Sequence, residues 1–299
     1  MRIAVTGATG FVGGAVAAAL AQREHEVTRF GRRPGVEYWD ITRGTHDGRF
    51  DAVVHCAAFA DDWAPIGEAM LANSIGTRNV VASFPGTRIV HVSTSSVYDA
   101  FTPSIRVTEQ AGPATRFLSS YSESKAAAEL ELAGVDAVIL RPHAVYGPGD
   151  TTLLPRILAG IRGSTLTLPN GAAVVHTLTH IDNLVEAVAL GLRGPAGTYN
   201  IGDDTDVLLS AVLTEFLARR GRRDVALKSI PYRAAFAAAA ALETLHRATR
   251  RGPGKAGRPR ITRYAVSQLG LERTLDLTAA RERLGYHPGP TSLAGAEQW

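Results

Sequence analysis

The ten residues VTGATGFVGG at positions 5–14 constrain the fold more than any other part of this sequence. They follow a short apolar run, RIAV at positions 2–5, and they lead into an alanine-rich stretch of helical composition. Gly7 permits a tight turn, Gly10 lets backbone N–H groups approach a pyrophosphate, and Gly13 lets the helix pack closely on the strand. A strand, a glycine turn and a helix in this order predict the first unit of a dinucleotide-binding sheet.

Two residues rather than one separate the first two glycines, so the motif is TGxxGxxG and not the commoner GxGxxG. The physical requirement is the same, because a bound anion would lie at the positive end of the helix. A turn that is merely rich in glycine is the alternative. We expect the cofactor to contact this turn at Gly7, Thr9, Gly10, Phe11 and Val12.

Short apolar runs alternate with helix-length amphipathic stretches over the first half of the chain. The runs are rich in Val, Ile and Ala and show little polar alternation, which is typical of strands covered on both faces. This rhythm predicts an α/β fold, a Rossmann-type doubly wound parallel sheet over residues 1–150. Helices are expected between the strands, including 11–22 and 66–82.

The rhythm becomes irregular after residue 150. We expect a smaller, mostly helical substrate-binding lid over residues 151–299, with segments near 174–203 completing the first domain. The basic Gly/Pro-rich stretch at 247–263 is expected to be solvated. The helices expected in this half are 153–162, 181–193, 208–220 and 231–250.

Composition excludes several classes of protein. With 299 residues and 45% hydrophobic content the chain can bury a full core. A single cysteine, Cys56, excludes an internal disulfide, and no Cys/His spacing indicates a metal site. The net charge of +4 comes with arginines spread along the chain, so no nucleic-acid partner is expected. No apolar run could span a bilayer and no signal peptide is evident, so we expect a cytoplasmic protein that acts on a small molecule, compatible with a homodimer.

Cofactor choice is indicated at the end of the second expected strand. Sites for NAD usually carry an acidic residue there that binds the adenosine ribose. Here Gly31 occupies that position and Arg32 and Arg33 follow it, and guanidinium groups match the oxygens of a 2′-phosphate. NADP(H) is therefore favoured, with NAD the alternative if the arginines are ordinary surface residues. Asp40 is expected near the adenine, although as an Asx-turn residue it would need no ligand.

The segment YSESK places Tyr121 and Lys125 four residues apart on a predicted helix. Positions i and i+4 share one helical face, so the phenol and the ammonium can meet. A nearby cation would lower the pKa of the phenol and let Tyr121 exchange a proton with a substrate oxygen near neutral pH. By itself this spacing also occurs by chance on half-exposed helices.

With the glycine motif and the Tyr/Lys pair both present, the chain resembles the extended short-chain dehydrogenase/reductase family over nearly its whole length. The resemblance implies that Tyr121 is the acid/base, that Lys125 binds the nicotinamide ribose, and that Thr94 hydrogen-bonds the substrate oxygen. It also implies cofactor contacts at Ile41, Ala57, Ala58 and Pro142. The stretches that agree are HCAA (55–58), NSIGTRNVV (73–81), VSTSSVYD (92–99), RPHAVYGPGD (141–150), HIDNLVEAV (180–188) and TYNIGDD (198–204).

Within that family, Trp63, Asp99 and the tail RPRITRYAVSQLG at 258–270 resemble the 3β-hydroxysteroid dehydrogenase-like branch. That branch acts mostly on apolar alcohols and ketones. The resemblance implies an NAD(P)-dependent oxidoreductase, with Trp63, Ser95 and His143 near a steroid-like, alkyl ketone or keto acid substrate. His143 is about as well explained as a loop histidine with satisfied hydrogen bonds.

Two other functions stay open. A sugar-nucleotide epimerase or dehydratase would share the fold and the Tyr/Lys pair, and a non-catalytic NADP(H) sensor would share the glycine turn. The alanine-rich helix at 231–250 could line an apolar cleft, lie on a membrane surface, or pack only on its own domain.

Overall fold

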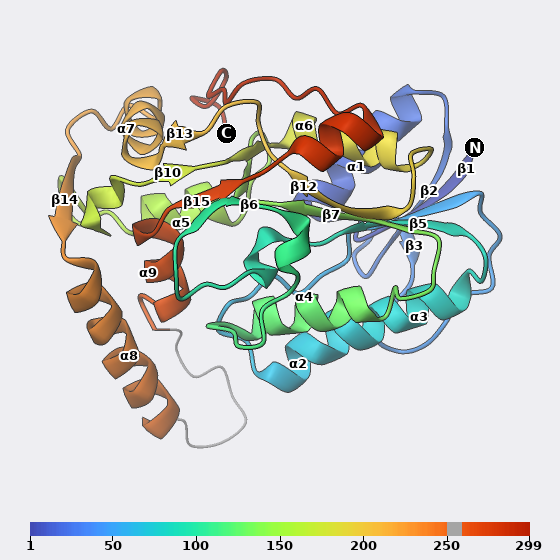
Figure 1. Cartoon of the computed structure of the whole chain (residues 1–299), viewed down its shortest axis with the longest axis horizontal. Helices are drawn as coiled ribbons and strands as arrows, with labels where there is room; N and C mark the ends of the chain where they lie inside the picture. Colours follow the sequence, from blue (N-terminus) through green and yellow to red (C-terminus); the bar gives the residue numbers. More distant parts are fainter. Residues whose placement is uncertain (250–258) are drawn as a thin grey trace.

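The structure is a computed structural model that describes residues 1–249 and 259–299. A seven-stranded sheet forms its centre, and every neighbouring pair of strands is parallel (Figure 1). The order confirms the predicted doubly wound α/β fold. The strands, in sheet order, are β12 (Gly197–Ile201), β7 (Ala137–Pro142), β5 (Arg88–Val92), β4 (Ala52–His55), β1 (Arg2–Thr6), β2 (Glu26–Gly31) and β3 (Glu37–Tyr38).

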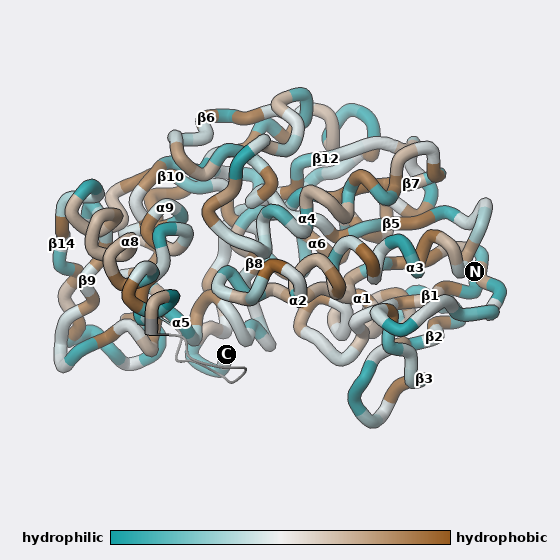
Figure 2. Tube along the Cα trace, turned by 90° about the horizontal axis from the view of Figure 1, so that it is seen from below, coloured by the Kyte–Doolittle hydropathy of each residue, from teal (hydrophilic) through white to brown (hydrophobic). Residues whose placement is uncertain are grey.

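Helices cover both faces of this sheet (Figure 1). Successive strand residues point to opposite faces, so Val5 and Val54 pack with the core that includes α1 and α6, whereas Ala4 and Val53 pack on the other side. This double burial explains the apolar runs in the sequence, and hydrophobic colour follows β5 and β7 in Figure 2. One face carries α1 (Phe11–Gln22) and α6 (Ile181–Gly191), and the other carries α2 (Ile66–Met70), α3 (Gly76–Ser83) and α4 (Ser120–Leu130).

The rest of the chain forms a lobe beyond one end of the sheet, with β9, β14, α5, α8 and α9 at the far end from β1–β3 in Figures 1 and 2. Its helices are α5 (Leu153–Ala159), α7 (Leu209–Arg219), α8 (Tyr232–Thr249) and α9 (Arg263–Gly270). Its strands are β6 (Ser104–Val107), β8 (Val145–Tyr146), β9 (Thr165–Pro169), β10 (Val175–His176), β11 (Thr179–His180), β13 (Val207–Leu208), β14 (Ala226–Ile230) and β15 (Arg273–Leu275). Short helical turns lie at η1 (Leu71–Ile75), η2 (Ser95–Val97), η3 (Glu109–Ala111), η4 (Asn170–Ala172) and η5 (Ala280–Leu284).

The second half of the chain contributes α6 and β12 to the central sheet, where β12 pairs with β7 as the edge strand. The division into domains at residue 150 stays a prediction. Most of the basic stretch at 247–263 lies outside the described residues. Within the described residues, no helix combines the length and the apolar character that a membrane crossing needs.

The helix expected at 66–82 is interrupted by the π-helical turn η1. Its Asn73 side chain is buried, receives a hydrogen bond from the Phe59 amide at 2.7 Å and donates to Ser124 Oγ at 2.8 Å. Thr77 donates its hydroxyl to the Asn73 carbonyl at 2.6 Å. A π turn contains one residue more than an α-helical turn. Here it directs the polar side chain of Asn73 toward α4. Helical periodicity alone does not reveal this insertion.

A buried ion pair fixes α4 to the sheet. Arg141, in β7, donates from Nε and Nη2 to the two carboxylate oxygens of Glu129 in α4, at 3.0 and 2.6 Å. Both side chains are about 95% buried. Tyr98 receives a further hydrogen bond from Arg141 at 3.0 Å, and Ser93 donates to Glu129 at 2.5 Å. The last turn of α4, which carries Glu129, is thereby bonded to Ser93 after β5 and to Arg141 in β7.

Candidate active site

The glycine turn between β1 and α1 has the close contacts that the motif predicts. Gly7 has a φ of +70°, and a Cβ there would lie 2.7 Å from the backbone of Ala57. A Cβ on Gly13 would lie 2.3 Å from the Gly7 carbonyl oxygen. Gly10 is the N-cap of α1, offers no side-chain cap, and no acidic residue occupies the first turn. The helix therefore presents free N–H groups and its positive end, which suits a pyrophosphate.

The other residues expected at the cofactor border the same end of the sheet. Ala57 and Ala58 follow β4, and the Ala57 amide donates to Thr6 Oγ1 at 3.3 Å. Pro142 is the buried last residue of β7. The carboxyl ends of parallel strands meet at one edge, so these positions lie along the same edge of the sheet as the glycine turn. Thr9, Phe11 and Val12 are half-buried within that turn, and Ile41 is buried next to Gly76 of α3.

The segment after β2 that is expected to select NADP over NAD is exposed to solvent. Arg32 and Arg33 are exposed at the end of β2, and neither makes an ion pair or side-chain hydrogen bond with another described residue. A Cβ on Gly31 would lie 3.2 Å from side-chain atoms of Thr9 and Val36, so an acidic residue there would be crowded. Asp40 accepts hydrogen bonds from the amide and hydroxyl of Thr42, as in an Asx turn.

Thr94 and Tyr121 meet at the end of β5. Thr94 follows that strand and caps η2, where its Oγ1 receives a hydrogen bond from the Ser96 amide at 3.1 Å. Tyr121 is the second residue of α4, whose N-cap is Ser119. Burial raises the pKa of the Tyr121 phenol, and a hydrogen bond with Thr94 lowers it in part. The two hydroxyl groups are therefore close enough to interact, and their catalytic roles stay a prediction.

Lys125 lies almost fully buried one turn further along α4. Its ammonium donates to the Val92 carbonyl at 2.9 Å and lies 2.9 Å from Nε2 of His91. Burial lowers the pKa of Lys125 to about 8, which the carboxylate of Glu129 partly offsets. The sequence hypothesis that Lys125 lowers the pKa of Tyr121 is not met here, because burial dominates and the ammonium is directed to β5 instead.

The lowered pKa of Lys125 predicts a pH effect on stability. Between the folded value of about 8 and the usual 10.5, the folded chain has released a proton that the unfolded chain retains. The free energy of unfolding then rises with pH, by at most about 1.4 kcal/mol per pH unit. Urea unfolding across this range should show the wild type gaining stability relative to Lys125→Met. A constant difference between the two would contradict the assignment.

Ser95 and His143, expected near substrate, form one hydrogen-bonded chain. Ser95 Oγ lies 2.9 Å from His143 Nδ1, and His143 Nε2 lies 3.2 Å from Nδ1 of His176. Nε2 of His176 lies 3.1 Å from the Leu271 carbonyl, which can only accept. Burial lowers the pKa of both imidazoles, of His176 to about 4, so both are neutral. Because the Leu271 carbonyl can only accept, His176 donates to it, His143 donates to His176, and Ser95 donates to His143.

Tyr264 is a residue of this site that sequence reasoning missed. It lies in α9, and its phenol is 2.6 Å from Ser96 Oγ, which in turn receives the Thr94 hydroxyl at 3.1 Å. Burial raises the pKa of Tyr264, and the nearby phenol of Tyr121 raises it further. This tyrosine lies in the tail at 258–270, which resembles the 3β-hydroxysteroid dehydrogenase-like branch, but the sequence analysis gave it no role in the site.

Other residues singled out from the sequence have structural contacts. The Arg247 guanidinium lies 4.9 Å from the centre of the Trp63 ring, which links the loop after β4 to α8. Phe236 in α8 packs with the cluster that joins α8 to α9. Burial raises the pKa of the Cys56 thiol to about 12, so this cysteine stays protonated. Among the described residues, no group of three His, Cys, Asp or Glu could hold a metal ion.

Comparison with known proteins identifies the family to which this chain belongs. The profile of the NAD dependent epimerase/dehydratase family matches residues 3–202. A 4-hydroxy-2-methyl-3-oxo-4-farnesyl-3,4-dihydroquinoline-1-oxide ketoreductase from Stigmatella aurantiaca is 31% identical over 99% of this chain and 95% of its own. A 2-alkyl-3-oxoalkanoate reductase from Stenotrophomonas maltophilia is 30% identical over 96% and 95%.

More distant proteins agree with this placement. A 3-beta-hydroxysteroid dehydrogenase from Mycolicibacterium neoaurum is 26% identical over 96% of this chain and 87% of its own. The solved dTDP-4-dehydrorhamnose reductase of Bacillus anthracis, in complex with NADP, superposes with a TM-score of 0.70 at 19% identity, covering 99% of this chain and 97% of that one. The latter likeness concerns the fold. The chain belongs to the NAD dependent epimerase/dehydratase family and is an NAD(P)-dependent oxidoreductase of the extended short-chain dehydrogenase/reductase type.

Proposed function

We propose that this protein uses NADP(H) to interconvert a ketone and an alcohol on a largely apolar small molecule. The observation that carries the proposal is the convergence of three side chains at the end of β5. Lys125 donates to the Val92 carbonyl, Thr94 follows two residues after Val92, and Tyr121 lies one helical turn before Lys125, where its phenol interacts with Thr94. These are the groups that a hydride transfer at a carbonyl needs next to the nicotinamide. The names of the relatives support it, since two are reductases of oxo compounds.

Each residue has a distinct task in the proposed reaction. The nicotinamide, when bound, supplies or accepts the hydride. Tyr121 donates its phenolic proton to the carbonyl oxygen as the alcohol forms and recovers it in the reverse direction. Thr94 holds the oxygen by a hydrogen bond. Lys125 uses two of its three N–H groups for His91 and Val92, which leaves one for a ribose hydroxyl.

The exposed arginines after β2 predict a preference for NADPH over NADH. Each charge-assisted contact with the 2′-phosphate should contribute roughly 1.5 to 3 kcal/mol. Calorimetric titration should show the preference in the wild type and its reduction in Arg32→Ala. Arg49→Ala, which changes a residue outside this segment, is the control. Equal affinities for the two cofactors in the wild type would rule the preference out.

The apolar character of the substrate is tested with a homologous series of ketones. Each buried methylene should contribute about 0.8 kcal/mol, so Michaelis constants should fall with chain length. A nucleotide sugar should neither bind nor compete. A flat ketone series together with thermal protection by a UDP- or dTDP-sugar would favour the epimerase or dehydratase function.

The proposal also covers the cellular location and the assembly of the protein. We propose that it acts in the cytoplasm, as a homodimer and without a nucleic-acid partner. Light scattering coupled to size exclusion tests the oligomeric state, and a monomer at micromolar concentration would remove the dimer from the proposal.

A further inference from the structure

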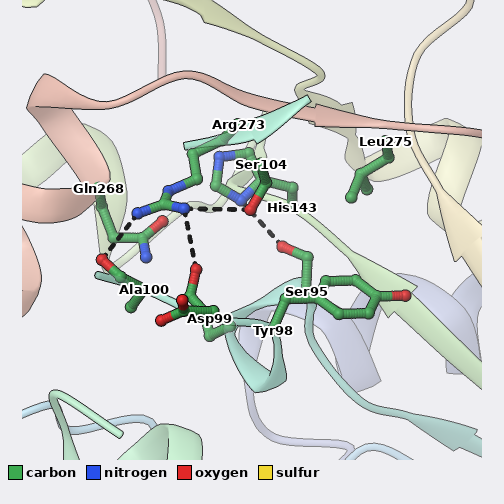
Figure 3. A pocket seen from close by; sticks show the side chains of 10 residues that line it. Ser95, Tyr98, Asp99, Ala100, Ser104, His143, Gln268, Arg273 and Leu275 are labelled. Carbon is green, nitrogen blue, oxygen red and sulfur yellow. Dashed lines mark hydrogen bonds between the residues drawn. The ribbon is translucent and has the colours of Figure 1, made fainter. Parts of the chain in front are cut away.

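Four histidines are buried in the described part of the chain, and one of them differs from the rest in its hydrogen bonds. His143 has a partner at each ring nitrogen, Ser95 at Nδ1 (Figure 3) and His176 at Nε2. His176 and His55 are also bonded at both nitrogens. His91 has a partner at Nε2, but its Nδ1 has none among the described residues. Such an atom is rare in a native fold and calls for an explanation.

The partner of His91 is the ammonium of Lys125, which lies 2.9 Å from Nε2. A protonated lysine can only donate, so Nε2 is the acceptor and the ring proton lies on Nδ1. That N–H group is buried and unpaired, which costs free energy that an apolar side chain at position 91 would avoid. The contact with Lys125 is the interaction that can offset this cost.

The other groups near the Lys125 ammonium do not take the place of His91. The Val92 carbonyl accepts a second N–H group at 2.9 Å. The Glu129 carboxylate, which is bonded to its arginine partner in β7, attracts the ammonium without an ion pair, and the Cys56 thiol is protonated. Within the described residues Lys125 has no carboxylate partner, so two acceptors in β5 hold its charge.

His55, beside His91 in the neighbouring strand β4, offers a matched comparison. The centres of the two rings are 5.0 Å apart, and both side chains are fully buried. Thr77 donates its own proton to a backbone carbonyl, so it accepts from Nε2 of His55, and Thr6 donates to Nδ1. His55 is therefore a neutral side chain bonded to two hydroxyls, and neither of its nitrogens is bonded to the ammonium.

We propose that His91 is a positioning residue for Lys125, whose ammonium it holds against β5 so that the remaining N–H group is directed to the ribose of the cofactor. This inference rests on the task of Lys125 in the proposed function. Burial already lowers the pKa of Lys125 to about 8. Without the acceptor at Nε2 the buried charged form would lose one of its two protein partners, so the lysine would release its proton at a lower pH.

The test is calorimetric titration of NADPH across a pH range that brackets this pKa, with His91→Gln and His91→Asn. The amide oxygen of Gln is as many bonds from Cβ as Nε2 is, whereas the amide of Asn ends at the level of Nδ1. In the wild type, NADPH affinity should fall above about pH 8, where Lys125 loses its proton. His91→Gln should keep the midpoint of this fall. His91→Asn should lower the midpoint by about one pH unit and weaken NADPH binding about tenfold at neutral pH.

The controls are His55→Gln and His55→Asn, which change the same buried layer and should leave the midpoint in place. Thermal unfolding without cofactor shows whether each variant folds, and His91→Leu, which also lacks the acceptor, replaces His91→Asn if the latter does not. The same midpoint and affinity in the wild type, His91→Gln and His91→Asn would overturn the positioning role. A shift of equal size in the His55 variants would also overturn it, because it would reflect the packing of the layer.

Lys125→Ala separates this inference from the proposed function, since cofactor binding requires no turnover. If Lys125→Ala weakens NADPH binding and removes its dependence on pH while the His91 variants bind as the wild type does, the lysine keeps its task and the positioning role is wrong. If Lys125→Ala binds NADPH as tightly as the wild type at every pH, the ribose contact of Lys125 is wrong, and the role of His91 falls with it.

Discussion

Tyr121→Phe should reduce kcat by about 10²- to 10⁴-fold, the range that a general acid contributes, and should leave NADPH affinity nearly unchanged. The substitution removes only the phenolic oxygen that interacts with Thr94. Steady-state turnover of a ketone that the wild type reduces, together with a calorimetric titration of NADPH, measures both quantities. Tyr232→Phe is the control, because that phenol makes no side-chain hydrogen bond with the described residues.

Lys125→Ala, in contrast to Tyr121→Phe, should weaken NADPH binding as well as turnover. The ammonium is proposed to hold the ribose, and it is also hydrogen-bonded to β5. The two variants should therefore differ in their effect on cofactor affinity. If Tyr121→Phe kept substantial turnover, the assignment of the acid/base would be wrong and Tyr264, which shares the hydroxyl cluster, would be the next residue to test.

Arg141→Met should destabilise the fold by about 3 to 5 kcal/mol, because it leaves the Glu129 carboxylate buried without its partner. Arg78→Met is a matched control. Arg78 also forms two hydrogen bonds with a carboxylate of the same region, Glu131, but its side chain is 63% exposed. That exposed pair should be worth less than about 1 kcal/mol. Urea denaturation of the three proteins measures the difference.

A loss in Arg141→Met no larger than in Arg78→Met would show that the buried pair does not hold α4 on the sheet. The double variant Arg141→Met with Glu129→Leu tests the cause. If the loss comes from the unpaired carboxylate, replacing both partners by apolar residues should recover much of the stability. A double variant as unstable as the single one would point instead to lost packing around Tyr98.

Much of the site followed from short stretches of sequence. The glycine turn follows β1, Thr94 follows β5, and Lys125 lies one helical turn after Tyr121, so each position depends on a strand end or on one turn of helix. Their geometry is set by local backbone structure once the strands are known to be parallel. For the same reason, the predicted helix at 11–22 matches α1 at both ends.

The sequence by itself determined the class of fold, the dinucleotide turn and the oxidoreductase function, because periodicity, glycine positions and short motifs report local conformation. The tertiary structure decided the environment of those groups. Tyr264 meets Ser96 across 168 residues, and Arg273 meets the loop after Thr94 over a similar separation. Burial then raised the pKa of Tyr121, against the expectation from Lys125. Such effects depend on how completely water is excluded, which is a property of the packed whole and not of any segment.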